Sequence, residues 1–174
     1  MTKTAAIHSI VAISCLVICS KCNPVIAPLK GKYSDSSFQI TTSKSSDTIW
    51  VKLTDIFVTH GLRVERIDKE KGAIRTVKAP INSLFTFEDQ SGHLEQPEAW
   101  VVLPKAFNKR KEWKPGDIFG VWTVHVVGSE KGITTVKIDP TVICTYYPNA
   151  FTTMEHRGQS TGKLEELFVT SLTN

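Results

Sequence analysis

The apolar positions from residue 46 to residue 61 predict an amphipathic helix. They recur at a spacing of three and four residues and form one stripe, which consists of Ile49, Trp50, Leu53, Ile56 and Phe57. Ser46 or Asp47 can cap the first turn, and Gly61 stands where a left-handed C-terminal cap is expected. The many β-branched residues make this a weak helix in isolation, so we expect it to pack against a sheet.

After this helix the pattern changes to short runs of strand-forming residues. The run "LRVERID-KEKG-AIRTVKA" predicts two strands about a turn at Lys69–Gly72, and further strands are predicted in "SLFTFED" and "AWVVLP". The strongest hairpin is "IFGVWTVHVV-GSEKG-ITTVKIDP", and "TVICTYYP" extends its second strand past a bulge at Pro140. If the turn of this hairpin centres on Glu130, His125 faces Thr135.

The end of the chain predicts a second helix, in "STGKLEELFVTSL". Ser160 or Thr161 can cap it, and its apolar face consists of Leu164, Leu167, Phe168 and Leu172. The order of a helix, five to six mostly antiparallel strands and a helix predicts an α+β fold. In this fold one sheet is packed by an N-terminal and a C-terminal helix. We expect a single domain over residues 38–174.

The first 19 residues predict an export signal. Lys3 is followed by the apolar run "AAIHSIVAISCLVIC", which is shorter than the roughly 20 residues that cross a bilayer. A buried N-terminal helix or strand of a cytosolic protein is the alternative interpretation. The position at the very start of the chain, and Asn23, Pro24 and Pro28 after the run, favour the export signal.

Three cysteines at the end of this run suggest lipidation of the kind found in bacterial lipoproteins. Cys15 follows a small serine but leaves a short signal, whereas Cys19 leaves a longer signal but follows a bulky isoleucine. Both cysteines stay open as the lipidated residue, while the lysine before Cys22 disqualifies that position. Cleavage after Ala27 without lipidation is the rival interpretation, which Pro28 disfavours.

A lipid anchor would place the protein on the bacterial cell envelope, and we expect the outer membrane, with the domain facing the periplasm or the surface. A lipoprotein carries several acyl chains, palmitate among them, which hold it far more firmly than one chain does. Residues 20–37, with Pro24, Pro28, Gly31 and "SDSS", predict a flexible tether.

The segment from Phe38 to Val77 resembles a module of bacterial envelope lipoproteins. The matching stretches are "SFQI", "DTIWVKLTDIFVTHG", "LRVERIDKEKG" and "AIRTV", and the C-terminal "STGKLEELF" fits as well. The pattern is similar to the helix-grip domains of the outer-membrane assembly lipoprotein BamC and its looser relatives. The resemblance covers about forty residues well. It implies a helix-grip-like fold and a non-catalytic domain that works by docking.

One basic stretch with aromatic residues is the candidate for contact with a partner. "KAFNKRKEWKPGD" reads as a loop, and cations among aromatic rings suit a lipid headgroup surface, an acidic glycan or an acidic protein. A solvated loop with its tryptophan in the core is the alternative. The candidate residues are Lys105, Phe107, Lys109, Arg110, Lys111, Trp113 and Lys114. The net charge of +4 is small for a nucleic-acid binder, so we expect no nucleic-acid partner.

The remaining polar residues give little indication of catalysis. No nucleophile elbow, metalloprotease, phosphate-loop or calcium-loop motif occurs, so we expect no metal and no cofactor. His60 suits a helix end, and most carboxylates flank turns or a helix start, where a solvated face is the expectation. Cys22 and Cys144 leave a disulfide open, but Cys144 also suits a small buried position.

The combined expectation is a membrane-anchored envelope lipoprotein that serves as a non-catalytic accessory or scaffold for other envelope proteins. The alternative is a periplasmic carrier that binds a lipid or glycan in a pocket between helix and sheet. A cell-wall hydrolase is the enzymatic alternative. A filled core with only surface grooves would favour the scaffold, and an apolar pocket between helix and sheet would favour the carrier.

Overall fold

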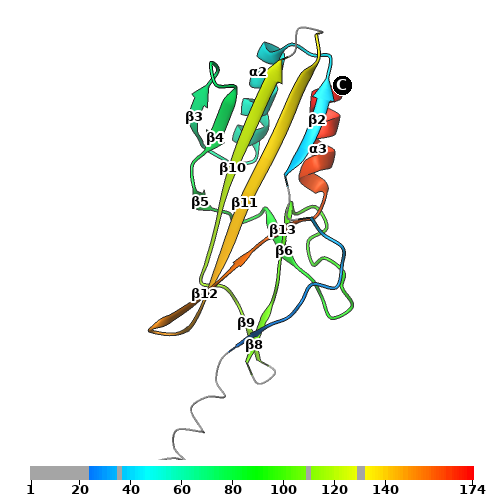
Figure 1. Ribbon diagram of the computed structural model, residues 1–174. Helices are drawn as coiled ribbons and strands as arrows, with labels where there is room; N and C mark the ends of the chain where they lie inside the picture. The colour runs from blue at the N-terminus through cyan, green and yellow to red at the C-terminus, as the bar shows by residue number, and fades with distance from the viewer. Residues whose placement is uncertain (1–23, 35–36, 109–110, 129–131) are drawn as a thin grey trace, which may run out of the picture.

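The computed structural model describes residues 24–34, 37–108, 111–128 and 132–174. In chain order the elements are β1 (Val25–Ile26), β2 (Phe38–Thr42), α2 (Ser46–Thr59), β3 (Val64–Asp68), β4 (Ala73–Thr76), β5 (Ala79–Pro80), β6 (Phe85–Phe87), β7 (Val101–Leu103), β8 (Ala106–Asn108), β9 (Lys111–Trp113), β10 (Asp117–Gly128), β11 (Thr134–Asn149), β12 (Thr152–Arg157), β13 (Gln159–Ser160) and α3 (Lys163–Thr173). The molecule is elongated, with β10 and β11 running along most of its length (Figure 1).

The predicted α+β class is confirmed, because a mostly antiparallel sheet is packed by two helices. The expected count of five to six strands is wrong: the main sheet has seven strands, and two further sheets have three strands each. The long β10 and β11 cause the difference, since each offers room for two partners along its outer side. β11 pairs with β2 near its start and with β12 near its end, and β10 pairs with both β4 and β5.

The hairpin of β10 and β11 forms as predicted, but its register is shifted by two residues. His125 faces Lys137 rather than Thr135, and no bulge occurs at Pro140, which faces Trp122 in a continuous ladder. Gly158 donates its backbone N–H to the carbonyl of Val142. The backbone N–H and C=O groups of the even-numbered residues in this part of β11 therefore point away from β10. On that side of β11 the pairing with β2 ends before Pro140, and the pairing with β12 begins after it. No partner strand therefore needs the backbone N–H that proline lacks.

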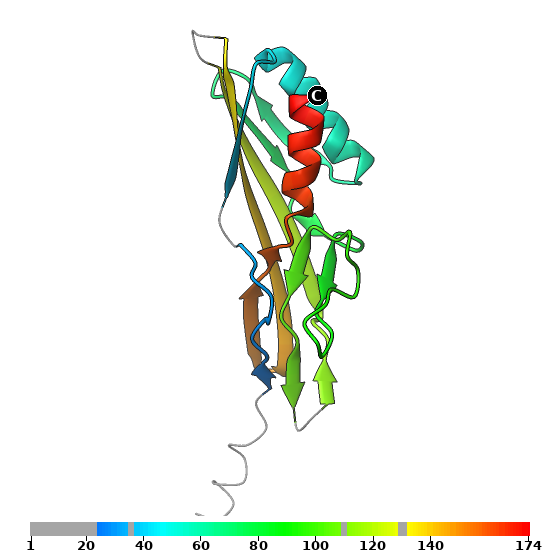
Figure 2. The same ribbon diagram turned by 90° about the vertical axis from the view of Figure 1, so that its right-hand side faces the viewer.

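Both helices lie on the same face of the main sheet, over its upper half (Figure 2). All five residues of the predicted stripe on α2 are buried, and the ring of Phe168 on α3 packs against Phe57 and Phe38 at centroid distances of 6.1 and 6.0 Å. The N-cap of α2 is Ser45, which accepts from the backbone N–H of Thr48, so both predicted caps are wrong by one or two positions.

The C-terminal cap of α2 matches the prediction, whereas the predicted N-cap of α3 at Ser160 or Thr161 is wrong. Gly61 has a positive φ of 72° directly after the C-cap of α2, as predicted. At α3 the N-cap is Gly162, with a φ of 90°, and the Ser160 hydroxyl accepts the backbone N–H of Gly162 from just outside the helix. Within the described residues, neither helix has the length and apolar character to span a bilayer.

Candidate docking surfaces

The basic stretch after residue 104 is a hairpin rather than the expected loop. β8 and β9 pair in antiparallel register, with Ala106 opposite Trp113 and Phe107 opposite Glu112. Because side chains alternate across a strand, Ala106 and Trp113 turn towards the core, where Ala106 is fully buried and Trp113 half-buried. The structure therefore separates the two predicted aromatic residues, since Phe107 lies on the other face.

The predicted contact residues fall into three groups. Lys105 and Phe107 line a cleft, Lys111 and Lys114 are exposed, and Trp113 packs against the core. Lys109 and Arg110 lie outside the described residues, as do Cys15 and Cys19.

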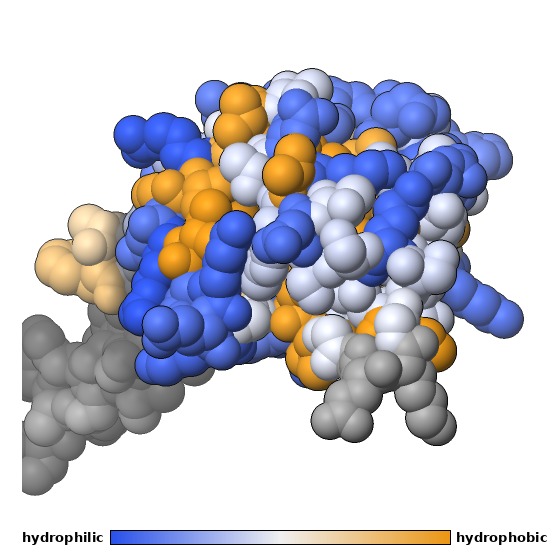
Figure 3. Space-filling model, turned by 90° about the horizontal axis from the view of Figure 1, so that it is seen from above, coloured by the Kyte–Doolittle hydropathy of each residue, from blue (hydrophilic) through white to orange (hydrophobic). Residues whose placement is uncertain are grey.

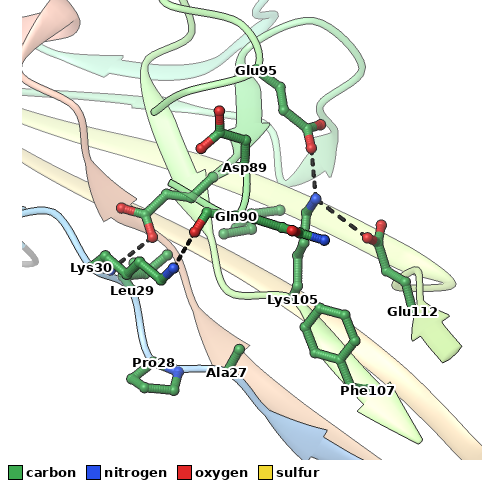
Figure 4. A pocket seen from close by; sticks show the side chains of 12 residues that line it. Ala27, Pro28, Leu29, Lys30, Asp89, Gln90, Glu95, Lys105, Phe107 and Glu112 are labelled. Carbon is green, nitrogen blue, oxygen red and sulfur yellow. Dashed lines mark hydrogen bonds and ion pairs between the residues drawn. The ribbon is translucent and has the colours of Figure 1, made fainter. Parts of the chain in front are cut away.

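Lys105 is not the free cation that the sequence suggested. Its ammonium group lies 2.6 Å from a carboxylate oxygen of Glu95 and 3.3 Å from one of Glu112, and its side chain is only 17% exposed (Figure 4). The hydrogen bond to Glu95 and the charge of Glu112 raise the pKa of Lys105. The ammonium group also lies 5.9 Å from the centre of the Phe87 ring. This lysine therefore fixes the cleft wall.

The cleft around Lys105 has a volume of about 580 Å³ and opens to solvent on one side. Residues 27–30 form one wall, and the loop after β6 and the β8–β9 hairpin form the others (Figure 4). The Nζ of Lys30 donates to the backbone carbonyl of Gln90 across the cleft. The sequence did not indicate that Glu95 and Glu112 would be the charged partners of Lys105. An alternation count over the hairpin would have paired Glu112 with Phe107, and nothing local indicated Glu95.

Glu88 corrects the expectation that the carboxylates of this stretch form a solvated face. It is only 7% exposed, and its two oxygens accept from the backbone N–H groups of Lys30 and Gly31 and from the Tyr33 hydroxyl, at 2.7 to 2.8 Å. Burial alone would raise the pKa of Glu88, but these donors together lower it below its usual value. Burial and the Glu88 carboxylate raise the pKa of Tyr33 to about 12.

These bonds hold a segment that we expected to belong to a tether. Val25 faces Phe107 and Ile26 faces Ala106 in the pairing of β1 with β8, and Ala27 donates its N–H to the carbonyl of Lys105 at 2.8 Å. Further along, Ser34 forms a bridge with Ser160. Residues 24–34 are therefore attached to the domain, and β1 lies beside the β8–β9 hairpin at its lower end (Figure 1).

A second hollow lies at the other end of the molecule, between the outer face of α2 and the edge strand β3. It has a volume of about 470 Å³ and is here named the α2–β3 groove. Its apolar lining is unusually open, since Val51 is 71%, Val58 64% and Ile67 45% exposed. Figure 3 looks down on this end and shows apolar surface bordered by hydrophilic side chains. Asp55 and Lys69 also line the groove.

Other candidate chemistry is absent from the described parts of the chain. No group of three or more His, Cys, Asp or Glu side chains is placed there to hold a metal ion. A ring nitrogen of His60 forms a hydrogen bond with the carbonyl of Ile56 at 2.8 Å, and the ring lies 4.7 Å from that of Trp100 at a tilt of 47°, which is the structural role expected of His60. Cys144 is a buried free thiol that donates to the carbonyl of His156, while Cys22 lies outside the described residues.

No protein-family model matches the chain, and no curated protein or solved structure matches it. The resemblance to BamC-type domains stays a prediction from the sequence motifs.

Proposed function

We propose that this chain is a lipid-anchored lipoprotein of the bacterial envelope, with a helix-grip-like domain that serves as a non-catalytic accessory or scaffold. The observation that carries the proposal is the attachment of β1 to β8. It places Val25 and Ile26 next to the β8–β9 hairpin, whose Lys111 and the following Lys114 are exposed. Cys19 precedes Val25 by six residues, a span of at most about 22 Å even when fully extended.

This geometry supports an orientation for the domain on the membrane. With either Cys19 or Cys15 as the anchor, the hairpin end faces the headgroups and the helix-covered end points away. Lys111 and Lys114 then lie where anionic headgroups attract cations, an effect that falls off within a Debye length of the surface. The helix-covered end then faces away from the membrane, towards other proteins of the envelope.

The filled interior supports docking rather than carriage of a ligand. The side chains between the helices and the sheet are packed, and Leu53, Phe57, Trp122 and Phe168 among them are fully buried. Three hollows among the described residues, of about 580, 550 and 470 Å³, all open at the surface of the molecule, and none is enclosed between the helices and the sheet. A carrier with an apolar pocket between helix and sheet would require a different interior.

The proposal is tested by metabolic labelling with an acyl-chain probe and membrane fractionation in a bacterial host. We expect the wild-type chain to be labelled and membrane-bound, and either Cys15→Ser or Cys19→Ser to abolish both properties. Cys22→Ser is the matched control and retains them. An unlabelled wild-type chain, or labelling that survives both substitutions, would contradict the lipoprotein assignment.

The orientation has its own measurement, which is lysine footprinting with an amine-reactive reagent. Lys111 and Lys114 are expected to lose reactivity when the anchored protein sits on anionic vesicles. Lys137 lies near the opposite end of β11 and keeps its reactivity. Equal protection of all three lysines would overturn the orientation without touching the lipid anchor.

A further inference from the structure

The strand β3 is an open edge of the main sheet. Among the described strands it pairs only with β4, at the end of the strand order opposite to β12. Exposed charges usually protect such an edge from pairing with another chain, and β3 carries several of them. Their order along the strand determines which partner strand the edge tolerates.

The backbone groups at the centre of β3 point outward. Val126 donates its N–H to the carbonyl of Gly72 at 2.7 Å, so the even-numbered positions of β4, including Ile74, direct their backbone groups towards β10. Ile67 is the residue opposite Ile74 across the β3–β4 pair. The alternation of the ladder therefore directs the N–H and C=O of Ile67 away from β4, towards the open side.

The charges of β3 are complementary to those of a second β3 strand in an antiparallel register centred on Ile67. A two-fold axis places one residue opposite its own copy, and centring the axis on Glu65, Arg66 or Asp68 sets like charges against each other. Centring it on Ile67 sets two apolar side chains together. Within one chain Arg66 already forms an ion pair of 2.7 Å with Asp68. In the Ile67-centred register Arg66 of each copy also lies opposite Asp68 of the other, which adds two opposite-charge contacts between the copies.

The α2–β3 groove lies beside this centre. Ile67 lines the groove together with the exposed Val51 and Val58 of α2, so its side chain is on the helix-covered face of the sheet. A two-fold axis perpendicular to the sheet brings the grooves of both copies together on that same face. Pairing would then cover the exposed part of Ile67 and narrow the opening of both grooves.

We propose that a second copy of this chain docks on the β3 edge, by antiparallel pairing about Ile67, and joins the two seven-stranded sheets. This self-association does not depend on the proposed envelope function. The interface relies on a short strand and exposed charges, so we expect a weak dimer. Its affinity should fall with rising salt concentration, because salt screens the charge pairs.

Sedimentation velocity of the purified full chain, from about 1 µM to 1 mM, tests the proposal. Wild type is expected to show a concentration-dependent dimer. Arg66→Asp places aspartates opposite each other twice and Asp68→Arg does the same with arginines, so each variant weakens the dimer at least about tenfold. An equimolar mixture of the two variants restores opposite charges at both positions and is expected to associate again.

Glu155→Arg, on the other edge strand β12, is the matched control and leaves association unchanged. Asp68 also accepts the backbone N–H of Lys71 at 3.0 Å, so folding of its variant is checked by circular dichroism. Arg66 is 68% exposed, so its substitution carries the test even if the Asp68 variant unfolds. A wild-type chain that stays monomeric, or an Arg66→Asp variant that associates like wild type, would overturn the proposal.

Discussion

Replacing Glu88 by glutamine should release the segment of residues 30–33 from the domain. One carboxylate oxygen accepts from the Gly31 N–H and the Tyr33 hydroxyl, and the other accepts from the Lys30 N–H. Glutamine can keep the first two bonds with its carbonyl, but its amide group then faces the Lys30 N–H as a second donor. A hydrogen bond to a charged group contributes about 1.5–3 kcal/mol, so we expect a loss of about 2 kcal/mol.

The pH dependence of this loss has a defined sign. The pKa of Glu88 is lowered in the folded state, so its contribution is fully present above the pKa of the unfolded state, about 4.3. The contribution disappears as the pH falls from there through the lower folded-state pKa. The stability difference between wild type and Glu88→Gln should therefore shrink on acidification below about pH 5.

Urea unfolding from pH 3 to pH 7 measures this difference, and hydrogen exchange at the Lys30 and Gly31 amides reports local release. Glu98→Gln is the matched control, because the Glu98 side chain is 87% exposed and only touches Lys163 at 3.7 Å. Amide exchange at Lys30 and Gly31 as slow as in wild type would refute the reasoning. A stability difference that grows on acidification would refute the assigned pKa direction.

Two further predictions concern the interior. Gly72→Ala should lower the free energy of unfolding by at least about 3 kcal/mol, because the φ of Gly72 is +60° and a Cβ there would lie 2.3 Å from the carbonyl oxygen of Val126. Gly132→Ala should lower it by about 1 kcal/mol, because Gly132 has a φ of +72° but open space around it. Equal losses of the two variants in thermal unfolding would contradict this reasoning. Burial raises the pKa of the Cys144 thiol, so peptide-resolved alkylation of the folded chain at pH 8 should leave Cys144 unmodified until urea unfolds it, and rapid labelling without urea would show that the site is open.

The helices were predictable because their apolar stripes repeat over three turns. The buried face of α2 matches its stripe, and that of α3 matches except for Leu167, which is only partly buried. The register of the β10–β11 hairpin was missed because its centre depends on the turn geometry, which composition does not reveal. The hairpin of β8 and β9 was read as a loop because its strands have three residues each and half of their side chains are polar.

The burial of Glu88 could not be predicted from local sequence. Its three donors come from residues 55 to 58 positions earlier in the chain, and two of them are backbone N–H groups that any residue would supply. Lys105 poses the same problem, since one of its carboxylate partners lies ten residues before it in a separate loop. From the sequence alone a charged residue is expected to be solvated. Only the fold shows which charged residues are buried against a partner.

The attachment of residues 24–34 also determines how the domain responds to mechanical force on its N-terminal side. Tension would first meet the two-residue pairing of β1, then the bonds around Glu88, and only afterwards the main sheet through β2. Detaching these eleven residues would add about 35–40 Å of extended chain while the helix-covered end stays folded. The segment would then act as an extensible linker, short while it is attached to the domain and longer under tension.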